Sequence, residues 1–176
     1  MNKRQWLVGG VAALAGTAGL GWGWWRFRSQ EPASGAVEPV WGMQWEDPSG
    51  KTIHLKDFRG RPLLLNFWAT WCPPCVEELP LLNAFYREQR AKGWQVLALA
   101  VDQPSSVRRF LEKLPLDFPV GMAGLDGTEL SRQLGNTNGG LPYTVAFDAH
   151  GRVAQKKLGK VSAQDLADWL RTIKVA

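Results

Sequence analysis

The chain has 176 residues, of which 45% are hydrophobic, and this length suits one domain with little left over. Its net charge of +5 comes from 21 basic and 16 acidic residues, but four of the basic ones flank a single uncharged N-terminal segment: Lys3, Arg4, Arg26 and Arg28. Setting those four aside leaves 17 basic against 16 acidic residues, a net of +1, so the composition gives no basic face for nucleic acid.

Residues 6–25 predict a membrane anchor. They are twenty consecutive residues without a charge, and a helix of that length spans about 30 Å, the thickness of a bilayer core. Three tryptophans gather at the end of this segment, as in the aromatic belt at a membrane interface: Trp22, Trp24 and Trp25. The membrane is therefore an expected partner of this chain.

Two other interpretations of the N-terminal segment stay open. Residues 13–15 read Ala-Leu-Ala, which resembles a signal-peptide cleavage site, although only a short apolar region precedes it. Residues 3–7 loosely resemble a twin-arginine export signal. We expect residues 1–28 to form the anchor or signal segment, residues 29–39 a polar linker, and residues 40–176 the folded domain.

The rest of the chain alternates strand and helix patterns. Residues 41–45 and 52–55 predict a β-hairpin around the turn residues Asp-Pro-Ser-Gly. An apolar run at 63–65, a helical segment at 76–90 and a second apolar run at 94–101 imply a parallel strand pair with a right-handed crossover. Two short helices are expected at 107–114 and 129–134, and a last helix should begin at a capping box formed by Ser162 and Asp165 and run to residue 170. Strands are expected at 118–120, 144–147 and 153–158.

Cys72 and Cys75 are the only two cysteines of the chain, and they lie in a C-x-x-C spacing where the strand ends and the helix begins. A helix N-terminus carries a partial positive charge and unpaired N–H groups, so Cys72 should ionise more easily than a free thiol. Pro73 and Pro74 suit a first helical turn, where a missing N–H breaks no hydrogen bond. Cys75 lies one turn further along and should act as the resolving thiol.

Other uses of two cysteines fit this sequence less well. A bridge across three residues closes almost no loop, so it would add little stability. A zinc site needs four ligands, and His54 and His150 have no ligand spacing to the cysteines, while haem attachment needs a histidine at the position of Val76. The sequence therefore predicts a redox-active disulfide between Cys72 and Cys75, without a cofactor or a metal.

Residues 66–75, Asn-Phe-Trp-Ala-Thr-Trp-Cys-Pro-Pro-Cys, resemble the active-site stretch of thioredoxin-like proteins. The continuation Val-Glu-Glu-Leu-Pro, with Glu78 three residues after the second cysteine, resembles the TlpA/ResA family of membrane-anchored thiol-disulfide oxidoreductases. The resemblance covers about residues 40–173. It implies an α/β, thioredoxin-like fold in which helices flank a central mixed sheet, with the N-terminal hairpin and the transmembrane anchor as additions.

The resemblance also implies a set of site residues. It makes the peptide bond before Pro142 cis and turns this proline toward the C-x-x-C, although the proline alone would favour a trans bond at an edge strand. Asn66 stands where many thioredoxins carry a proton-relaying aspartate, so Glu78 becomes the candidate acceptor for the Cys75 proton, with a solvated helix residue as the alternative. The candidate catalytic residues are Cys72, Cys75, Glu78 and Pro142, and the candidate substrate-binding residues are Trp71, Pro73, Pro74 and Leu141.

The implied activity is that of a dithiol reductant for exported protein disulfides. Two substrate classes follow from the resemblance: apocytochrome c before haem attachment, and other oxidised exported proteins. A membrane electron donor of the DsbD/CcdA type would re-reduce the chain, which has no third cysteine. The resemblance places the catalytic domain on the periplasmic side of the cell inner membrane, or free in the periplasm after signal cleavage. We expect a monomer.

Two alternative functions are weighed against this one. A peroxiredoxin-like thiol peroxidase shares the fold, but its P-x-x-x-T-x-x-C pattern does not match, because Thr70 lies too close to Cys72 and position 65 is leucine. A thiol-bearing or copper-binding chaperone would use the two cysteines to hold a partner or soft Cu(I).

Overall fold

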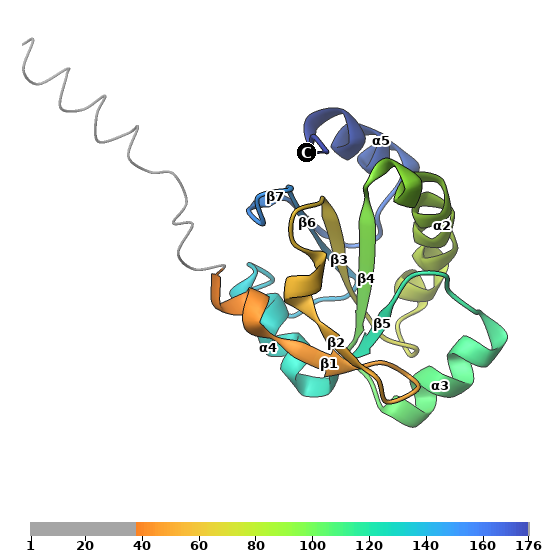
Figure 1. Cartoon of the computed structure of the whole chain (residues 1–176). Helices are drawn as coiled ribbons and strands as arrows, with labels where there is room; N and C mark the ends of the chain where they lie inside the picture. Colours follow the sequence, from red (N-terminus) through yellow and green to blue (C-terminus); the bar gives the residue numbers. More distant parts are fainter. Residues whose placement is uncertain (1–37, 176) are drawn as a thin grey trace, which may run out of the picture. The chain divides into compact units, whose positions relative to one another are not determined.

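The computed structural model describes residues 38–175, which form a central sheet with helices packed around it (Figure 1). The anchor or signal segment expected at 1–28 and nearly all of the linker expected at 29–39 lie outside the described residues. Within residues 38–175, no helix is both long enough and apolar enough to cross a membrane.

The central sheet is mixed, as predicted. Its strands are β3 (Leu63–Trp68), β4 (Gln95–Ala100), β5 (Val120–Met122), β6 (Tyr143–Phe147) and β7 (Val153–Leu158), in the spatial order β5-β4-β3-β6-β7. The β3–β4 and β4–β5 pairs are parallel, and the β3–β6 and β6–β7 pairs are antiparallel. All six residues of β3 and all six of β4 are buried, because helices and loops cover both faces of these strands and their sequences can be almost wholly apolar.

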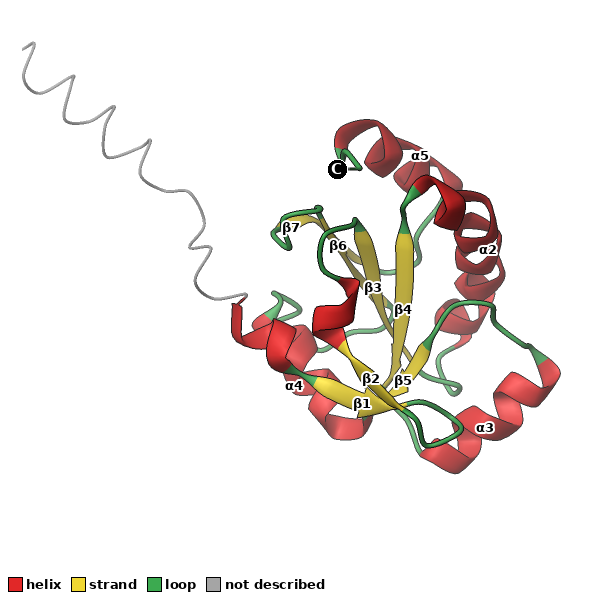
Figure 2. Ribbon diagram, viewed as in Figure 1, coloured by secondary structure: helices red, strands yellow, loops and turns green. Residues whose placement is uncertain are grey.

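Within residues 38–175, α-helices and the hairpin cover the two faces of the sheet (Figure 2). The helices are α2 (Pro73–Gln89), α3 (Pro104–Lys113), α4 (Gly124–Gln133) and α5 (Ala163–Thr172). Side chains alternate along β3, so Leu64 and Trp68 enter a core shared with α2, α3 and α5, while Leu65 and Phe67 enter a second core shared with α4 and the hairpin. The disulfide-bearing start of α2 belongs to the first of these cores.

Two local predictions from the sequence are confirmed. The hairpin pairs β1 (Gln44–Glu46) with β2 (Thr52–His54), and the Asp47 carboxylate closes its turn by accepting hydrogen bonds from the backbone N–H groups of Ser49 and Lys51. The capping box at the start of α5 is also present, with Ser162 and Asp165 each bonding the backbone of the other. Both features depend on residues close in sequence, which is why pattern alone found them.

Two expected boundaries are wrong, and tertiary packing explains both. Trp41 lies in a 3-10 helix (η2, Glu38–Gly42) rather than in the first hairpin strand, because its indole N–H donates to the Gly151 carbonyl at 3.2 Å. α4 begins at Gly124 rather than at 129. The sequence prediction started the helix too late because Gly124 and Gly127 weaken the helical pattern. Gly127 is needed there, since a Cβ atom at this position would lie only 2.8 Å from the Cβ of Ala123.

Two further elements are displaced beside prolines. The strand expected at 118–120 is β5, Val120–Met122, because Pro119 has no N–H to donate to the ladder and only its carbonyl accepts, from Ala98 N. α3 begins at Pro104 instead of at 107, since proline suits the first helical turn. Neither shift changes the order of the elements around the C-x-x-C.

Candidate functional site

Cys72 and Cys75 form a disulfide at the start of α2, with their Cα atoms 5.3 Å apart. Cys72 is the N-cap residue of the helix, and Pro73 and Pro74 follow in its first turn, exposed to solvent. Cys72 retains 5% of its surface exposed, whereas Cys75 retains none. Cys72 therefore keeps a small exposed fraction beside the exposed Pro73 and Pro74, whereas Cys75 lies wholly inside the core.

Pro142 follows a cis peptide bond with Leu141, as the resemblance implied. The proline directly precedes β6, which runs antiparallel to β3 and pairs Tyr143 with Phe67. The start of β6 therefore lies at the same end of the sheet as the end of β3, where the chain continues to Cys72. Leu141 is half-buried and packs against both cores.

Glu78 is buried inside the domain and is not the solvated helix residue weighed as its alternative. Its Oε1 accepts a hydrogen bond from Asn66 Nδ2 at 2.8 Å, and its Oε2 accepts one from the backbone N–H of Val161 at 2.7 Å. Burial raises the pKa of Glu78 above its ordinary value of 4.5, and the two hydrogen bonds and the Lys160 charge offset only part of that rise. The carboxyl group can therefore hold a proton at a higher pH than an exposed glutamate.

Asn66 connects Glu78 to the sheet. Its Nδ2 also donates to the hydroxyl oxygen of Thr144 at 2.9 Å, while its Oδ1 is buried without a hydrogen-bond partner. Thr144 lies opposite Asn66 in the β3–β6 ladder, so the strand register brings the two side chains together. Sequence reasoning treated Asn66 only as a missing aspartate, and it missed Thr144 and Val161, which no local motif marks.

Two exposed apolar side chains line a hollow beside the residue that precedes Cys72. Trp71, which directly precedes Cys72, is 66% exposed, and Leu125 at the start of α4 is 87% exposed. Both line a hollow of about 340 Å³ together with Leu141. Thr70 holds the Trp71 segment in place, since its backbone N–H donates to Asp102 Oδ2 at 2.8 Å. Leu125 was not predicted as a site residue, because its exposure is visible only in the folded chain.

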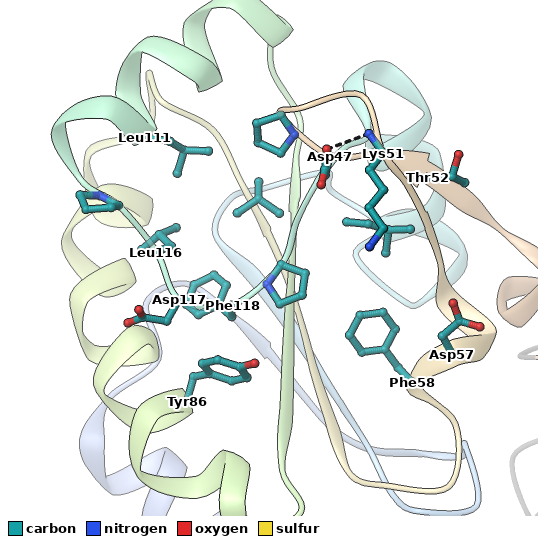
Figure 3. Close-up of a pocket in the computed structure, with 15 residues that line it drawn as sticks. Asp47, Lys51, Thr52, Asp57, Phe58, Tyr86, Leu111, Leu116, Asp117 and Phe118 are labelled. Atoms are coloured by element: carbon teal, nitrogen blue, oxygen red, sulfur yellow. Dashed lines mark hydrogen bonds between the residues drawn. The ribbon is translucent and has the colours of Figure 1, made fainter.

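A second hollow, of about 640 Å³, lies between the hairpin turn, Tyr86 of α2 and the segment that leads into β5 (Figure 3). Phe58, Tyr86 and Phe118 form part of its wall, and Asp47 and Lys51 lie at the hairpin side. None of the predicted site residues lines it. Within residues 38–175, no three histidine, cysteine, aspartate or glutamate side chains are grouped as metal ligands.

Comparisons with known proteins agree with this geometry. The model of the Redoxin family matches residues 43–170. The thiol-disulfide oxidoreductase ResA of Bacillus thuringiensis subsp. konkukian is 36% identical over 128 residues, which cover 72% of each chain. ResA of Halalkalibacterium halodurans is 28% identical over 179 residues, covering 98% of this chain and 97% of the relative.

The similarity extends to solved structures. A crystal structure of a thiol:disulfide interchange protein of the thioredoxin family from Chlorobium tepidum superposes with a TM-score of 0.64 at 27% identity. The superposition covers 73% of this chain and 90% of that one. Together with the buried C-x-x-C disulfide and the cis-proline loop, these matches show that the chain belongs to the Redoxin family and is a ResA-like thiol-disulfide oxidoreductase.

Proposed function

We propose that this oxidoreductase reduces disulfides of exported proteins, with Cys72 as the attacking thiol and Cys75 as the resolving thiol. The observation that carries the proposal is the asymmetry of the disulfide: Cys72 is the N-cap residue of α2 and keeps 5% of its surface exposed, whereas Cys75 is fully buried one turn further along. The partner would approach Cys72, the cysteine of the pair that keeps some exposed surface. The helix N-terminus favours the thiolate at the same position.

The reaction transfers two electrons to the partner. The Cys72 thiolate attacks one sulfur of the partner disulfide, a Cys72–partner bond forms, and the other partner sulfur leaves as a thiolate. Cys75 then loses its proton and attacks the Cys72 sulfur, which breaks the mixed disulfide and forms the Cys72–Cys75 bond. The partner leaves fully reduced and the enzyme leaves oxidised.

Glu78 is the proposed acceptor for the Cys75 proton. It lies one helical turn after Cys75 on α2, and its raised pKa suits a group that must take a proton from a thiol. Pro142 and Leu141 are proposed to align the partner chain beside the sulfurs, and Trp71, Pro73 and Pro74 to contact it from the helix side. The hollow next to Trp71 and Leu141 could receive an apolar side chain near the partner's cysteine.

The location and the partners complete the proposal. Residues 6–25 would anchor the chain in the cell inner membrane with the domain of residues 40–176 on the periplasmic side, and residues 29–39 would serve as the linker. The chain would act as a monomer. A membrane donor of the DsbD/CcdA type would supply electrons, because the sequence holds no third cysteine that could pass them on internally. Apocytochrome c is one proposed substrate class.

Trapping tests the proposal in cells. The Cys75→Ala variant should accumulate a mixed disulfide through Cys72, since the resolving thiol is absent, and mass spectrometry of the adduct identifies the substrate. The Cys72→Ser variant is the matched control and should trap nothing. Adducts through Cys75 in that control would show that the nucleophile assignment is wrong, and a trapped protein other than apocytochrome c would redirect the substrate class.

A further inference from the structure

The contacts of Glu78 decide which of its two oxygens can carry a proton. Oε2 accepts from the backbone N–H of Val161 at 2.7 Å, and a backbone donor cannot turn away. The proton of neutral Glu78 therefore belongs on Oε1, the oxygen that faces Asn66 Nδ2 at 2.8 Å. In that state an O–H donor and an N–H donor would point at each other, and the hydrogen bond between Glu78 and Asn66 would be lost.

Asn66 has the chemistry to remove this conflict. A half turn of its amide about the Cβ–Cγ bond exchanges Oδ1 and Nδ2 without changing the shape of the side chain. Oδ1, which is buried without a partner in the present orientation, would then accept from Glu78 Oε1–H. The Thr144 hydroxyl accepts from Nδ2 in the present orientation and can donate to Oδ1 after the turn, because a hydroxyl group does both.

We propose that Asn66 is a positioning residue whose amide turns over when Glu78 gains or loses its proton, so that the Glu78–Asn66 hydrogen bond is kept in both protonation states. An aspartate at this position would place a second carboxylate against Glu78, whereas the asparagine can serve either as donor or as acceptor. This inference rests on the proposed function, in which Glu78 takes the proton of Cys75. The inference gives a chemical reason why asparagine stands at position 66 in place of the usual aspartate.

The charged side chains around Glu78 do not take the positioning role proposed for Asn66. On the helix side, Glu77 is exposed and forms an ion pair with Lys160 at 2.8 Å. Lys160, in the loop before α5, lowers the pKa of Glu78 from a distance but makes no hydrogen bond with it. Lys157 of β7 is paired with Asp165 at 3.0 Å. The sheet side presents the uncharged side chains of Asn66 and Thr144.

Nuclear magnetic resonance can detect the turn directly. The full chain, in detergent micelles and with the disulfide intact so that no thiol titrates, is labelled with ¹⁵N at its five asparagines. When Glu78 is ionised, the Asn66 side-chain NH₂ protons should show nuclear Overhauser effects to Thr144. These effects should disappear as the pH falls, with the midpoint at which the Glu78 carboxyl carbon titrates.

Asn83 is the internal reference for this experiment. Its Nδ2 donates to the Asp117 carboxylate at 3.0 Å, and its Oδ1 accepts from the Asp117 backbone N–H at 2.8 Å, which fixes the amide orientation. Its Overhauser effects should keep the same partners across the pH range in which Glu78 titrates. A change confined to Asn66 would therefore result from protonation of Glu78 and not from a general loosening of the fold.

The Glu78→Gln variant provides an independent test without a titration. Its amide oxygen must face the Val161 N–H, so its NH₂ group faces Asn66 and imitates the protonated carboxyl group. Asn66 should then show the low-pH pattern at every pH, and Glu77→Gln should leave it as in the wild type. Contacts between the Asn66 NH₂ group and Thr144 that persist in Glu78→Gln and throughout the wild-type titration would overturn the inference. A disulfide-reduction assay on the same samples separates that outcome from a failure of the proposed function.

Discussion

The two sides of the disulfide face different surroundings. On the outer side, Trp71, which directly precedes Cys72, is 66% exposed, and Leu125, which lines the same hollow as Trp71, is 87% exposed. On the inner side, Cys75, Glu78 and Asn66 are buried, and hydrogen bonds through Asn66 join Glu78 to Thr144 of the sheet. The outer side can bind a partner by removing apolar surface from water, whereas in the proposed reaction the inner side would move a proton where charge is poorly solvated. Under the proposed mechanism, partner binding and proton transfer would therefore use separate sets of residues.

Replacing either cysteine with serine is expected to have the largest effect on turnover. Cys72→Ser should reduce the turnover of a protein disulfide to the rate measured without enzyme, because the outer thiolate starts the reaction. Cys75→Ser should also fail to turn over but should still form one mixed disulfide per chain. Stopped-flow measurement with gel analysis of the adduct checks both. A Cys72→Ser variant that retains wild-type turnover would contradict the division into outer and inner thiols.

Replacing the inner carboxylate should have the next largest effect. Glu78→Gln should slow the resolving step by about 10²-fold, the lower end of the range for a positioned general base, and should change the attack by Cys72 much less. Glu77→Gln is the matched control, since this neighbour is exposed on the same helical turn. Single-turnover kinetics with a pre-formed mixed disulfide isolates the resolving step. Equal rates in the two variants would remove Glu78 from the reaction.

Shortening the exposed Trp71 side chain should weaken substrate binding and leave the chemical step unchanged. Trp71→Ala should raise KM for a protein disulfide about five- to thirty-fold, equivalent to about 1–2 kcal/mol of binding, with kcat nearly unchanged. The KM for a small-molecule disulfide should not change, because such a substrate is too small to cover the exposed Trp71 side chain. Val175→Ala is the control, an exposed apolar residue that packs beside Gly93. The separation of roles fails if Trp71→Ala lowers kcat for both substrates.

The smallest expected effect is on stability. Since the pKa of Glu78 is raised above 4.5 in the folded chain, the folded state binds this proton more tightly than the unfolded state does. The free energy of unfolding of the wild type relative to Glu78→Gln should therefore fall as the pH rises from about 4.5 to the folded-state pKa, and should stay level above it. Urea denaturation of both oxidised proteins at several pH values measures this difference. A difference that rises with pH would mean that the site favours the charged carboxylate.

The sequence by itself determined the features that depend on neighbouring residues. The C-x-x-C at a strand-to-helix junction, the hairpin turn of Asp47 and the capping box of Ser162 all join residues within a few positions of one another. Their geometry follows from local backbone preferences and short-range hydrogen bonds, so pattern and resemblance were enough to find them. Glu78 was also found in this way, because it stands at a fixed helical spacing from Cys75.

Only the tertiary structure decided what Glu78 touches. Its partner Val161 lies 83 positions away, and Asn66 and Thr144 are 78 positions apart until the β3–β6 register sets them face to face. The exposure of Leu125, the 3-10 conformation at Trp41 and the early start of α4 likewise depend on how distant elements pack. No local pattern encodes such contacts, because they arise when burial of apolar surface brings distant strands, helices and loops together and their remaining polar groups must find partners.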